Sequence, residues 1–593
     1  MHSRRILTSI LIICLIATLL TGCAKSGSGE HEPITMLALF PDTAAFVDKV
    51  HEKYPEINIE LTAYGGANMS AYIGAQLKSG DMPDIFITTN YMPEYEDLSD
   101  RLIDLSGYEF TNNFSEAHLR NISDEGALYL LPTFFSAIGI TYNKTLLDKH
   151  GWRLPKTLDE FEELAAKAKK AGVGLALDQY ALPGYGFQYL CNILDTGYLN
   201  TPGGRKWQND FLSGKATLAD SPQMSESFEI LQKWKDIGML NDDADFTNDV
   251  VTKKKMAEGN TLFMLGGMNN FEEEDTEDEF GIMPYLSKDG TKNALVLQIG
   301  RYVGINKKLQ KPENKQKLED ALHVLEVLST VDGMSTLNES YEPVCILPLK
   351  DYEIPDDSYY KPVEKELDAG MTAPFLYNGW ENIIVPIGNV AIDFIRGKAS
   401  LEDVKRAFDE NQDLLLNSAN GEYTTITEKL NTDECARLVG ICFAKAADAE
   451  LALISKNRFC TVDGKTVQNN RGVSGELFAL PVTDQELTSI LPTGWRDNIQ
   501  TVTLTGAEIK KLYEEGYRHP DSGVYYPYEM VTPEGVKLED DKTYKTVICG
   551  ASEETAAKGR LRDTGILGLD AARDFLSQYE SFSKSDLVWR QGK

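Results

Sequence analysis

YIGAQLKSGDMPDIFITTNY, residues 72–91, joins a helix end, a turn and a strand in one short stretch. Gly80 is placed to end the helix, because glycine readily adopts the left-handed conformation found at helix C-caps. Residues 81–83 then turn the chain. The run DIFIT at 84–88 has the length and composition of a buried strand. The stretch therefore predicts a helix that returns the chain to a sheet.

The segments before this stretch show the same alternation of strand and helix. ITMLALF at 34–40 is a nearly continuous apolar run of buried-strand length. Phe46, Val50 and Tyr54 recur at helical spacing after Asp42, which predicts a helix. EINIEL at 56–61 alternates apolar and polar residues, as half-buried strands do. Strand, helix and strand in this order predict a parallel α/β sheet.

The segments after it continue the pattern. LYLLP at 128–132 and IGITYNK at 138–144 are strand-like. PKTLDEFEELAAKAKKAG at 155–172 predicts a helix in which Thr157 and Glu160 form a capping box and Gly172 ends the last turn.

An ordered series of these motifs resembles the family 1 extracellular solute-binding proteins, relatives of maltose-binding protein. The closely similar segments are KYPEINIE at 53–60, LKSGDMPDIF at 77–86, IDLS at 103–106, LP at 131–132, ITYNKTLLDKHGW at 140–152 and PKTLDEFEELA at 155–165. Looser matches are NTLFMLGG at 260–267, FGIMPYLSKDG at 280–290, IGRYVGINKK at 299–308 and IRGKASLEDVKRAF at 395–408. The resemblance implies an α/β, two-lobed periplasmic-binding-protein-like fold of type II over residues 31–416, with a ligand cleft between the lobes.

The pocket residues are expected on loops that follow strands, because ligands bind outside the carboxyl ends of parallel strands. The candidates in the first half are Asp42, Thr89, Asn90, Tyr91 and Ser136. The candidates in the second half are Tyr185, Phe187, Asn269, Arg301 and Trp380.

Two interpretations stay open for these side chains. Tyr91, Tyr185 and Trp380 are either stacking platforms for sugar rings or ordinary packing residues. Arg301 either faces an anionic ligand bidentately or pairs with a carboxylate, and so acidic a chain favours the carboxylate. Met268 stands where sugar binders of the family place a tryptophan after GG, which departs from a maltose-type pocket.

A further segment follows a predicted linker at 417–424. ARLVGICFAKAA predicts a helix, AELALIS a strand, and QTVTLTGAEIKKLYEEG a strand that runs into a helix. Thr505 and Glu508 cap this last helix, with Ile509, Leu512 and Tyr513 on its apolar face.

Residues 425–593 resemble the C-terminal domain of 5'-nucleotidases, which implies a separate α/β (α+β) domain. The match runs through ADAELALISKNRF, VTDQELTSILP, NIQTVTLTGAEIKKL, DSGVYYPYE and DKTYKTVICG. In that family the domain holds the nucleoside between aromatic rings. The corresponding second-site candidates are Arg458, Trp495, Asn498 and Tyr525. The strand end ISKNR lacks the two glycines of the family turn, and LPTGWRDN replaces its Pro-Phe-x-Asn, so the ancestral pocket is in doubt.

The N-terminus has the layout of a secretory signal. Arg4 and Arg5 precede fifteen mostly apolar residues at 6–20, fewer than the roughly twenty that cross a bilayer. LTGC at 20–23 resembles the lipobox of bacterial lipoproteins, which implies a signal peptide at 1–22 and a diacylglycerol on Cys23. Residues 23–30 then form a flexible tether on the extracytoplasmic face of the cell membrane.

Composition narrows the possible functions. A formal net charge of −32 argues against binding to nucleic acid or to an anionic membrane surface. The chain has seven histidines and eight cysteines, without the spacing of a zinc site or of a two-metal phosphoesterase. Whether the cysteines after residue 430 form a disulfide stays open. The acidic run EEEDTED at 272–278 predicts a solvated loop. We therefore expect no metal and no cofactor.

Three functions stay open. The favoured one is a non-enzymatic, membrane-anchored protein that captures a small solute, a carbohydrate by family resemblance, for the permease of an ABC importer. The second is a nucleotide or phosphate-ester hydrolase, or a nucleoside-binding component, acting through the C-terminal segment. The third is a surface sensor or adhesin.

Overall fold

The computed structural model describes residues 31–589 except for a set of short segments. The segments outside the description are 41, 63, 65–67, 89–97, 121, 123–125, 178–182, 200, 241–248, 266–274, 375–379, 418–420, 457–459, 463–464, 468–471, 492–497, 519–524 and 550–558. Cys23, the predicted signal and the predicted tether also lie outside the described residues. In the described part of the chain, no helix is both long enough and apolar enough to cross a membrane.

The first lobe is built on a six-stranded sheet in which β9 pairs with three neighbours, β10, β3 and β4. Its strands are β1 (Ile34–Leu37), β2 (Ile59–Thr62), β3 (Ile85–Thr88), β4 (Leu131–Ile138), β9 (Leu295–Ile305) and β10 (Thr372–Pro374). Its helices are α2 (Thr43–Lys53), α3 (Met69–Ser79), α4 (Glu116–Arg120), α11 (Lys315–Leu328), α12 (Val331–Asn338) and α13 (Glu364–Asp368). β1, β2 and β3 are parallel, which confirms the predicted α/β start.

The motif at 77–86 explains how this sheet is aligned. Gly80 ends α3 in the left-handed conformation, with φ of 73°, as predicted. Asp84 is buried, and its carboxylate accepts a hydrogen bond from the Thr35 amide at 3.0 Å, while its own amide donates to the Thr35 hydroxyl at 2.9 Å. This reciprocal pair fixes the start of β3 against β1.

The second lobe has a four-stranded sheet in the order β6-β7-β5-β8. Its strands are β5 (Ile140–Asn143), β6 (Gly174–Leu177), β7 (Thr261–Leu265) and β8 (Phe280–Met283). Its helices are α5 (Lys144–His150), α6 (Leu158–Ala171), α7 (Pro183–Leu194), α8 (Pro202–Leu212), α9 (Pro222–Ile237), α10 (Asp249–Ala257), α14 (Glu381–Ile395) and α15 (Leu401–Asn417). α6 begins after Thr157 and ends at Gly172, as its capping residues predicted.

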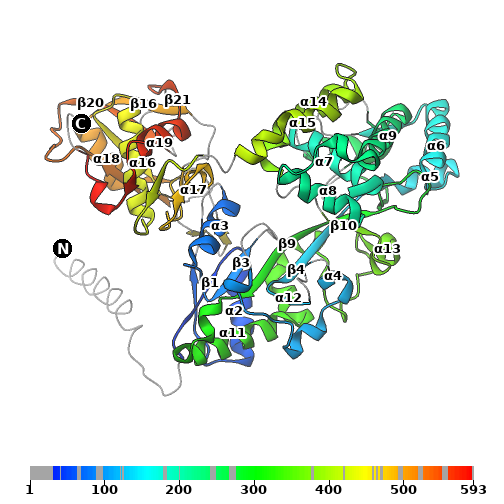
Figure 1. Ribbon diagram of the computed structural model, residues 1–593, viewed down its shortest axis with the longest axis horizontal. Coiled ribbons are helices and arrows are strands. Elements are labelled where there is room, and N and C mark those ends of the chain that lie inside the picture. Colours follow the sequence, from blue (N-terminus) through cyan, green and yellow to red (C-terminus); the bar gives the residue numbers. More distant parts are fainter. Residues whose placement is uncertain are drawn as a thin grey trace, which may run out of the picture.

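The lobes are joined where β4 passes into β5 through Gly139. A Cβ at Gly139 would lie 2.5 Å from the Met283 carbonyl oxygen and 2.9 Å from a Leu295 methyl carbon, so only glycine fits the crossing. Phe135, Ala137 and Ile282 lie close to the crossing and belong to a small apolar cluster that is separate from the cores of the two lobes. Figure 1 shows the two lobes meeting at these strands.

The C-terminal segment, residues 421–589, contains two larger sheets, in the orders β15-β11-β22 and β19-β12-β20-β16-β21, and the two-stranded sheets β13-β14 and β17-β18. Its strands are β11 (Thr424–Ile426), β12 (Leu451–Ser455), β13 (Cys460–Val462), β14 (Lys465–Val467), β15 (Pro481–Val482), β16 (Asn498–Thr505), β17 (Tyr517–Arg518), β18 (Tyr525–Tyr526), β19 (Tyr528–Val531), β20 (Thr543–Cys549), β21 (Arg562–Leu567) and β22 (Ser581–Phe582). Its helices are α16 (Thr432–Ala446), α17 (Asp484–Ile490), α18 (Gly506–Glu515) and α19 (Gly568–Leu576).

Two sequence-based expectations change in this segment, and the question of a disulfide, which the sequence leaves open, is answered for two cysteines. α15 extends to residue 417 and β11 begins at Thr424, so the predicted linker is shorter at both ends. Tyr513 is 44% exposed, so the apolar face of α18 consists of Ile509 and Leu512 without it. The thiols of Cys435 and Cys442 are buried and form no disulfide within the described residues, and burial raises the pKa of both above the ordinary value.

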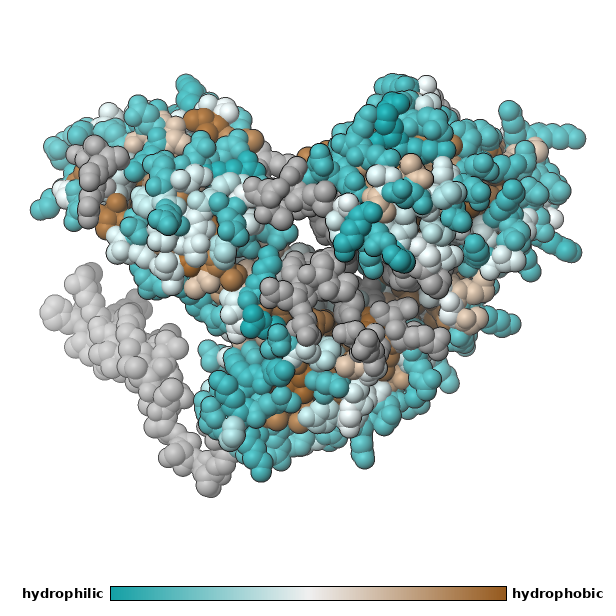
Figure 2. Space-filling model, in the orientation of Figure 1, coloured by the Kyte–Doolittle hydropathy of each residue, from teal (hydrophilic) through white to brown (hydrophobic). Residues whose placement is uncertain are grey.

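The C-terminal segment packs on the first lobe through α17 and α3. Phe478 belongs to the core of the first lobe, where its ring lies 5.8 Å from that of Tyr72. The buried Tyr64 ring stacks on Tyr72 at 4.3 Å, and its hydroxyl donates to the Ser489 carbonyl at 2.6 Å. Figure 1 shows α17 beside α3. The face visible in Figure 2 is mostly hydrophilic, in keeping with the charge of −32.

The Tyr64 hydroxyl gives a test of this contact. Tyr64→Phe leaves the Ser489 carbonyl without its bond from Tyr64, and a buried carbonyl that loses its partner costs about 1–3 kcal/mol. We expect a lower urea midpoint, measured by fluorescence. Tyr513→Phe is the matched control, because the exposed Tyr513 should change stability by less than about 0.5 kcal/mol. Equal midpoints for the two variants would show that the contact does not stabilise the protein.

Candidate ligand-binding site

The candidate site of the first lobe lies at the carboxyl ends of β1 and β3. β9 runs antiparallel to β3 and places Tyr302 opposite Thr88, the last residue of β3. Arg301 therefore stands at the same edge of the sheet as Leu39 and Phe40, which follow β1. This is the edge where α/β sheets bind ligands.

The pairing of β4 with β9 is irregular at this edge. The register shifts on both sides of Phe134, which pairs with Arg301. A Cβ at Gly300 would lie 1.8 Å from the Phe134 ring, so the glycine allows the ring to lie against β9. Phe134 also stacks on Tyr341, with 5.1 Å between ring centroids. The irregularity thus places two aromatic rings beside Arg301, a common use of β-bulges near functional sites.

The Arg301 guanidinium is enclosed by aromatic rings and, among the described residues, is bonded only to neutral groups. It lies 5.2 Å from the centre of the Phe40 ring and 5.7 Å from that of Tyr341. Its Nη atoms donate to the Gly300 carbonyl at 2.9 Å, the Leu39 carbonyl at 3.4 Å and the Tyr341 hydroxyl at 3.3 Å. Its Nε is buried without a hydrogen-bond partner in the described part of the chain. Burial lowers the pKa of Arg301 below its ordinary value.

An acidic chain favours a carboxylate partner for Arg301, but among the residues that the structure describes Arg301 bonds only to neutral groups. Asp42, the acidic residue of the loop after β1, is bonded elsewhere. Its two carboxylate oxygens accept from the amide and the hydroxyl of Ser340, both at 2.8 Å. Asp42 therefore ties its loop to the segment that carries Tyr341.

In the second lobe, two of the predicted aromatic residues are buried in the core and one is partly exposed. Trp380 is 1% exposed and packs between Phe211 and Phe408 in the lobe core, and Phe187 is fully buried beside it. A stacking role is wrong for Trp380, and ligand contact is wrong for Phe187, because both rings are enclosed by the core. Tyr185, in the first turn of α7, is partly exposed and stays a candidate.

The remaining candidates divide in two groups. Ser136 is buried in β4, where its hydroxyl donates to the Gln298 carbonyl at 3.4 Å, so it belongs to the strand pair rather than to a pocket. Thr89, Asn90, Tyr91 and Asn269 lie outside the described residues. Tyr341, by contrast, was missed, because no periodicity or motif in its segment distinguishes it from a surface tyrosine.

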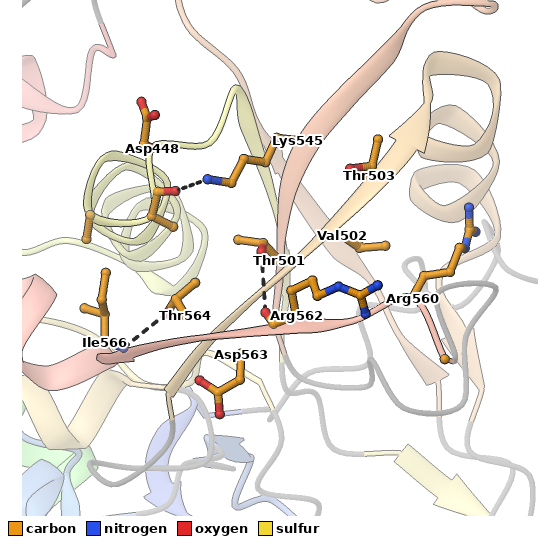
Figure 3. Close-up of a pocket in the computed structure, with 13 residues that line it drawn as sticks. Asp448, Thr501, Val502, Thr503, Lys545, Arg560, Arg562, Asp563, Thr564 and Ile566 are labelled. Atoms are coloured by element: carbon orange, nitrogen blue, oxygen red, sulfur yellow. Dashed lines mark hydrogen bonds between the residues drawn. The ribbon is translucent and has the colours of Figure 1, made fainter.

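A hollow of about 740 Å³ lies on the C-terminal segment (Figure 3). Thr501 and Thr503 of β16, Lys545 of β20 and Arg562 of β21 line it. Lys545 donates to the Ala447 carbonyl at 2.7 Å, and the Thr501 hydroxyl donates to the Arg562 carbonyl at 3.4 Å.

The predicted second site is described only in part. Asn498 donates from its side-chain amide to Asp563, a residue that lines this hollow, at 3.2 Å. Arg458 and Trp495 lie outside the described residues, and of Tyr525 only the backbone, in β18, is described. Among the described residues there is no cluster of three or more histidine, cysteine or acidic side chains that could hold a metal ion.

Comparison with known proteins agrees with the two-lobed fold. Residues 37–332 match the family model described as bacterial extracellular solute-binding protein. The solved structure of a family 1 extracellular solute-binding protein from Bifidobacterium longum subsp. infantis aligns with a TM-score of 0.52 at 18% identity, over 65% of this chain and all of that one.

Two curated relatives match at lower coverage. The chain is 24% identical over 235 residues to an uncharacterized ABC transporter extracellular-binding protein of Pyrococcus horikoshii, covering 36% of this chain and 55% of that one. It is 23% identical over 279 residues to the melibiose/raffinose/stachyose-binding protein MelE of Bacillus subtilis, covering 44% of this chain and 62% of that one. The matched region thus spans between half and two thirds of each relative.

Gly300→Ala tests the packing that shapes this site. The added Cβ would overlap the Phe134 ring, and overpacking of this kind costs about 1–3 kcal/mol. We expect a lower urea midpoint for this variant. Gly107→Ala is the control, because Gly107 is exposed and a Cβ added there would meet no described atom within 4 Å. A Gly300→Ala protein as stable as the control would contradict the close packing of Phe134 on β9.

Proposed function

We propose that this protein captures a small carbohydrate between its two lobes and delivers it to the permease of an ABC importer. The observation that carries the proposal is the edge of the first sheet, where Phe40, Phe134, Tyr341 and Arg301 gather at the carboxyl ends of β1 and β3. Aromatic rings pack against the CH faces of sugar rings, and an arginine guanidinium donates hydrogen bonds to sugar oxygens. The similarity to MelE, a melibiose/raffinose/stachyose-binding protein, supports a sugar ligand.

The mechanism that we propose is hinge closure without any chemical step. The lobes meet at the Gly139 crossing and at β9, and small dihedral changes there move one lobe against the other. A ligand that contacts both lobes favours the closed state by its extra affinity for that state. Tyr185 of the second lobe, with Thr89, Asn90, Tyr91 and Asn269, would complete the ligand contacts.

We also propose an extracytoplasmic location with a lipid anchor on Cys23. The support is the order of basic residues, apolar run and LTGC box in the sequence. Acyl chains hold a soluble protein at a bilayer because each buried CH₂ contributes about 0.8 kcal/mol. Such an anchor would keep the captured solute close to the permease.

The C-terminal segment, in our proposal, is an accessory domain related to the C-terminal domain of 5'-nucleotidases. It has its own apolar clusters, built from α16, α19 and the strands around β12, and it packs on α3. A nucleoside-binding or hydrolytic role for this segment is the alternative. It predicts that nucleosides or nucleotides stabilise the protein.

A thermal-unfolding screen of the full chain separates these functions. The panel contains neutral mono- and oligosaccharides, acidic sugars, nucleosides and nucleotides. A sugar at one hundred times its Kd should add about 2.7 kcal/mol to the stability of the protein that binds it. Stabilisation by a nucleotide alone would favour the alternative. If no sugar shifts the transition, the protein does not act by sugar capture.

Tyr185 provides a variant test for the same screen. Removing a stacking ring costs about 0.5–1.5 kcal/mol, so Tyr185→Ala should weaken binding of the stabilising sugar by about 2- to 10-fold in isothermal titration. Tyr513→Ala is the control, because Tyr513 is exposed on the C-terminal segment. Equal affinity for both variants would remove Tyr185 from the site.

A further inference from the structure

The structure holds a positive charge that the described residues do not neutralise. Arg301 lies at the ligand-binding edge of the first lobe with Nε buried and, within the described part of the chain, unbonded. Its remaining donors reach two carbonyls and one hydroxyl, and two of these three contacts, at 3.4 and 3.3 Å, are long. Burying a cation without a counter-charge is unfavourable, and proteins normally pair it.

The chain is rich in acidic residues, but none of them pairs with Arg301 in the described part of the chain. It carries 91 acidic residues against 59 basic ones. Asp42, the acidic residue of the adjoining loop, is bonded through both oxygens to Ser340. Side chains that surround the guanidinium are instead the aromatic rings of Phe40 and Tyr341.

This arrangement preserves the donor capacity of Arg301 for something that binds there. The rings of Phe40 and Tyr341 flank the guanidinium, and of these two residues only Tyr341 takes an N–H group, through its hydroxyl at 3.3 Å. In such surroundings a charge-assisted hydrogen bond to an oxyanion is stronger than one in water. A planar fork of donors also favours an oxyanion that can accept two parallel bonds.

We propose that the sugar bound by this protein carries an anionic group, a carboxylate, sulfate or phosphate, that pairs with Arg301. The inference rests on the proposed function and narrows its substrate class from carbohydrates in general to acidic carbohydrates. The partly exposed ring of Tyr341 would contact the sugar ring, and Arg301 would select the charge. Because the net charge is −32, a cation without a counter-charge in the described part of the chain would offset the general repulsion between this protein and an anionic ligand.

Isothermal titration of the full chain with charge-matched sugar pairs tests the proposal. The pairs are galacturonate with galactose, glucuronate with glucose, digalacturonate with a neutral disaccharide, and glucose 6-phosphate and a glucose sulfate with glucose. We expect an acidic member to bind at least about 10-fold more tightly than its neutral partner. The member that does so identifies the anion as carboxylate, phosphate or sulfate.

Variants of Arg301 assign the preference to this side chain. Arg301→Gln should remove the advantage of the acidic sugar, about 10- to 100-fold in Kd, so that the acidic and the neutral partner bind this variant with similar affinity. Arg301→Lys, which keeps the charge and loses the fork, should retain part of the advantage. Arg406→Gln is the matched control, because Arg406 is exposed on α15 in the second lobe. Thermal unfolding without ligand confirms that each variant is folded.

The outcomes separate this inference from the proposed function. Neutral sugars that bind as tightly as acidic ones to the wild-type protein would overturn the inference and leave sugar capture in place. An acidic preference that survives in Arg301→Gln would also overturn it. If no sugar of either kind binds the wild-type protein, sugar capture itself fails.

Discussion

The pairing of β9 with three strands is the interaction on which the rest of the structure depends. This strand of 11 residues is antiparallel to β3 and β4 and parallel to β10, so it completes the sheet of the first lobe. Its start packs against Gly139 at the crossing between the lobes, through Leu295. Further along β9, Gly300 and Arg301 lie at the edge of the sheet where β1 and β3 end. A single strand therefore links lobe architecture, hinge and candidate site.

The surroundings of Arg301 follow from the pairing of β9 with its neighbouring strands and from the small size of Gly300. Because Gly300 has no side chain, the Phe134 ring can lie on β9 and stack on Tyr341. Asp42 holds the Tyr341 segment by its two bonds to Ser340. The guanidinium is thus placed by groups that do not neutralise it. Such placement costs folding free energy in the absence of a ligand, and binding of an anion would recover it.

Much of the fold could be predicted from the sequence because its signals are local. Capping residues such as Thr157, Gly172 and Thr505 determine where helices begin or end by contacts within one turn, and the structure confirms them. The site could be predicted only in part, because orientation depends on partners far along the chain. Trp380 is at a plausible loop end, yet the aromatic core of the second lobe buries it. Tyr341 carries no local signal and reaches the site only through the fold.

The route of the chain into the C-terminal segment limits how the lobes can move. α15 ends at Asn417 within the second lobe, whereas the segment that begins with β11 at Thr424 packs on α3 of the first lobe. The connection between them can span at most about 25 Å when fully extended. As long as Tyr64 and Phe478 hold the segment to the first lobe, it adds a further link between the lobes to the chain crossings β4–β5, β8–β9 and β10–α14. Hinge motion at Gly139 must therefore stay within the reach of this connection.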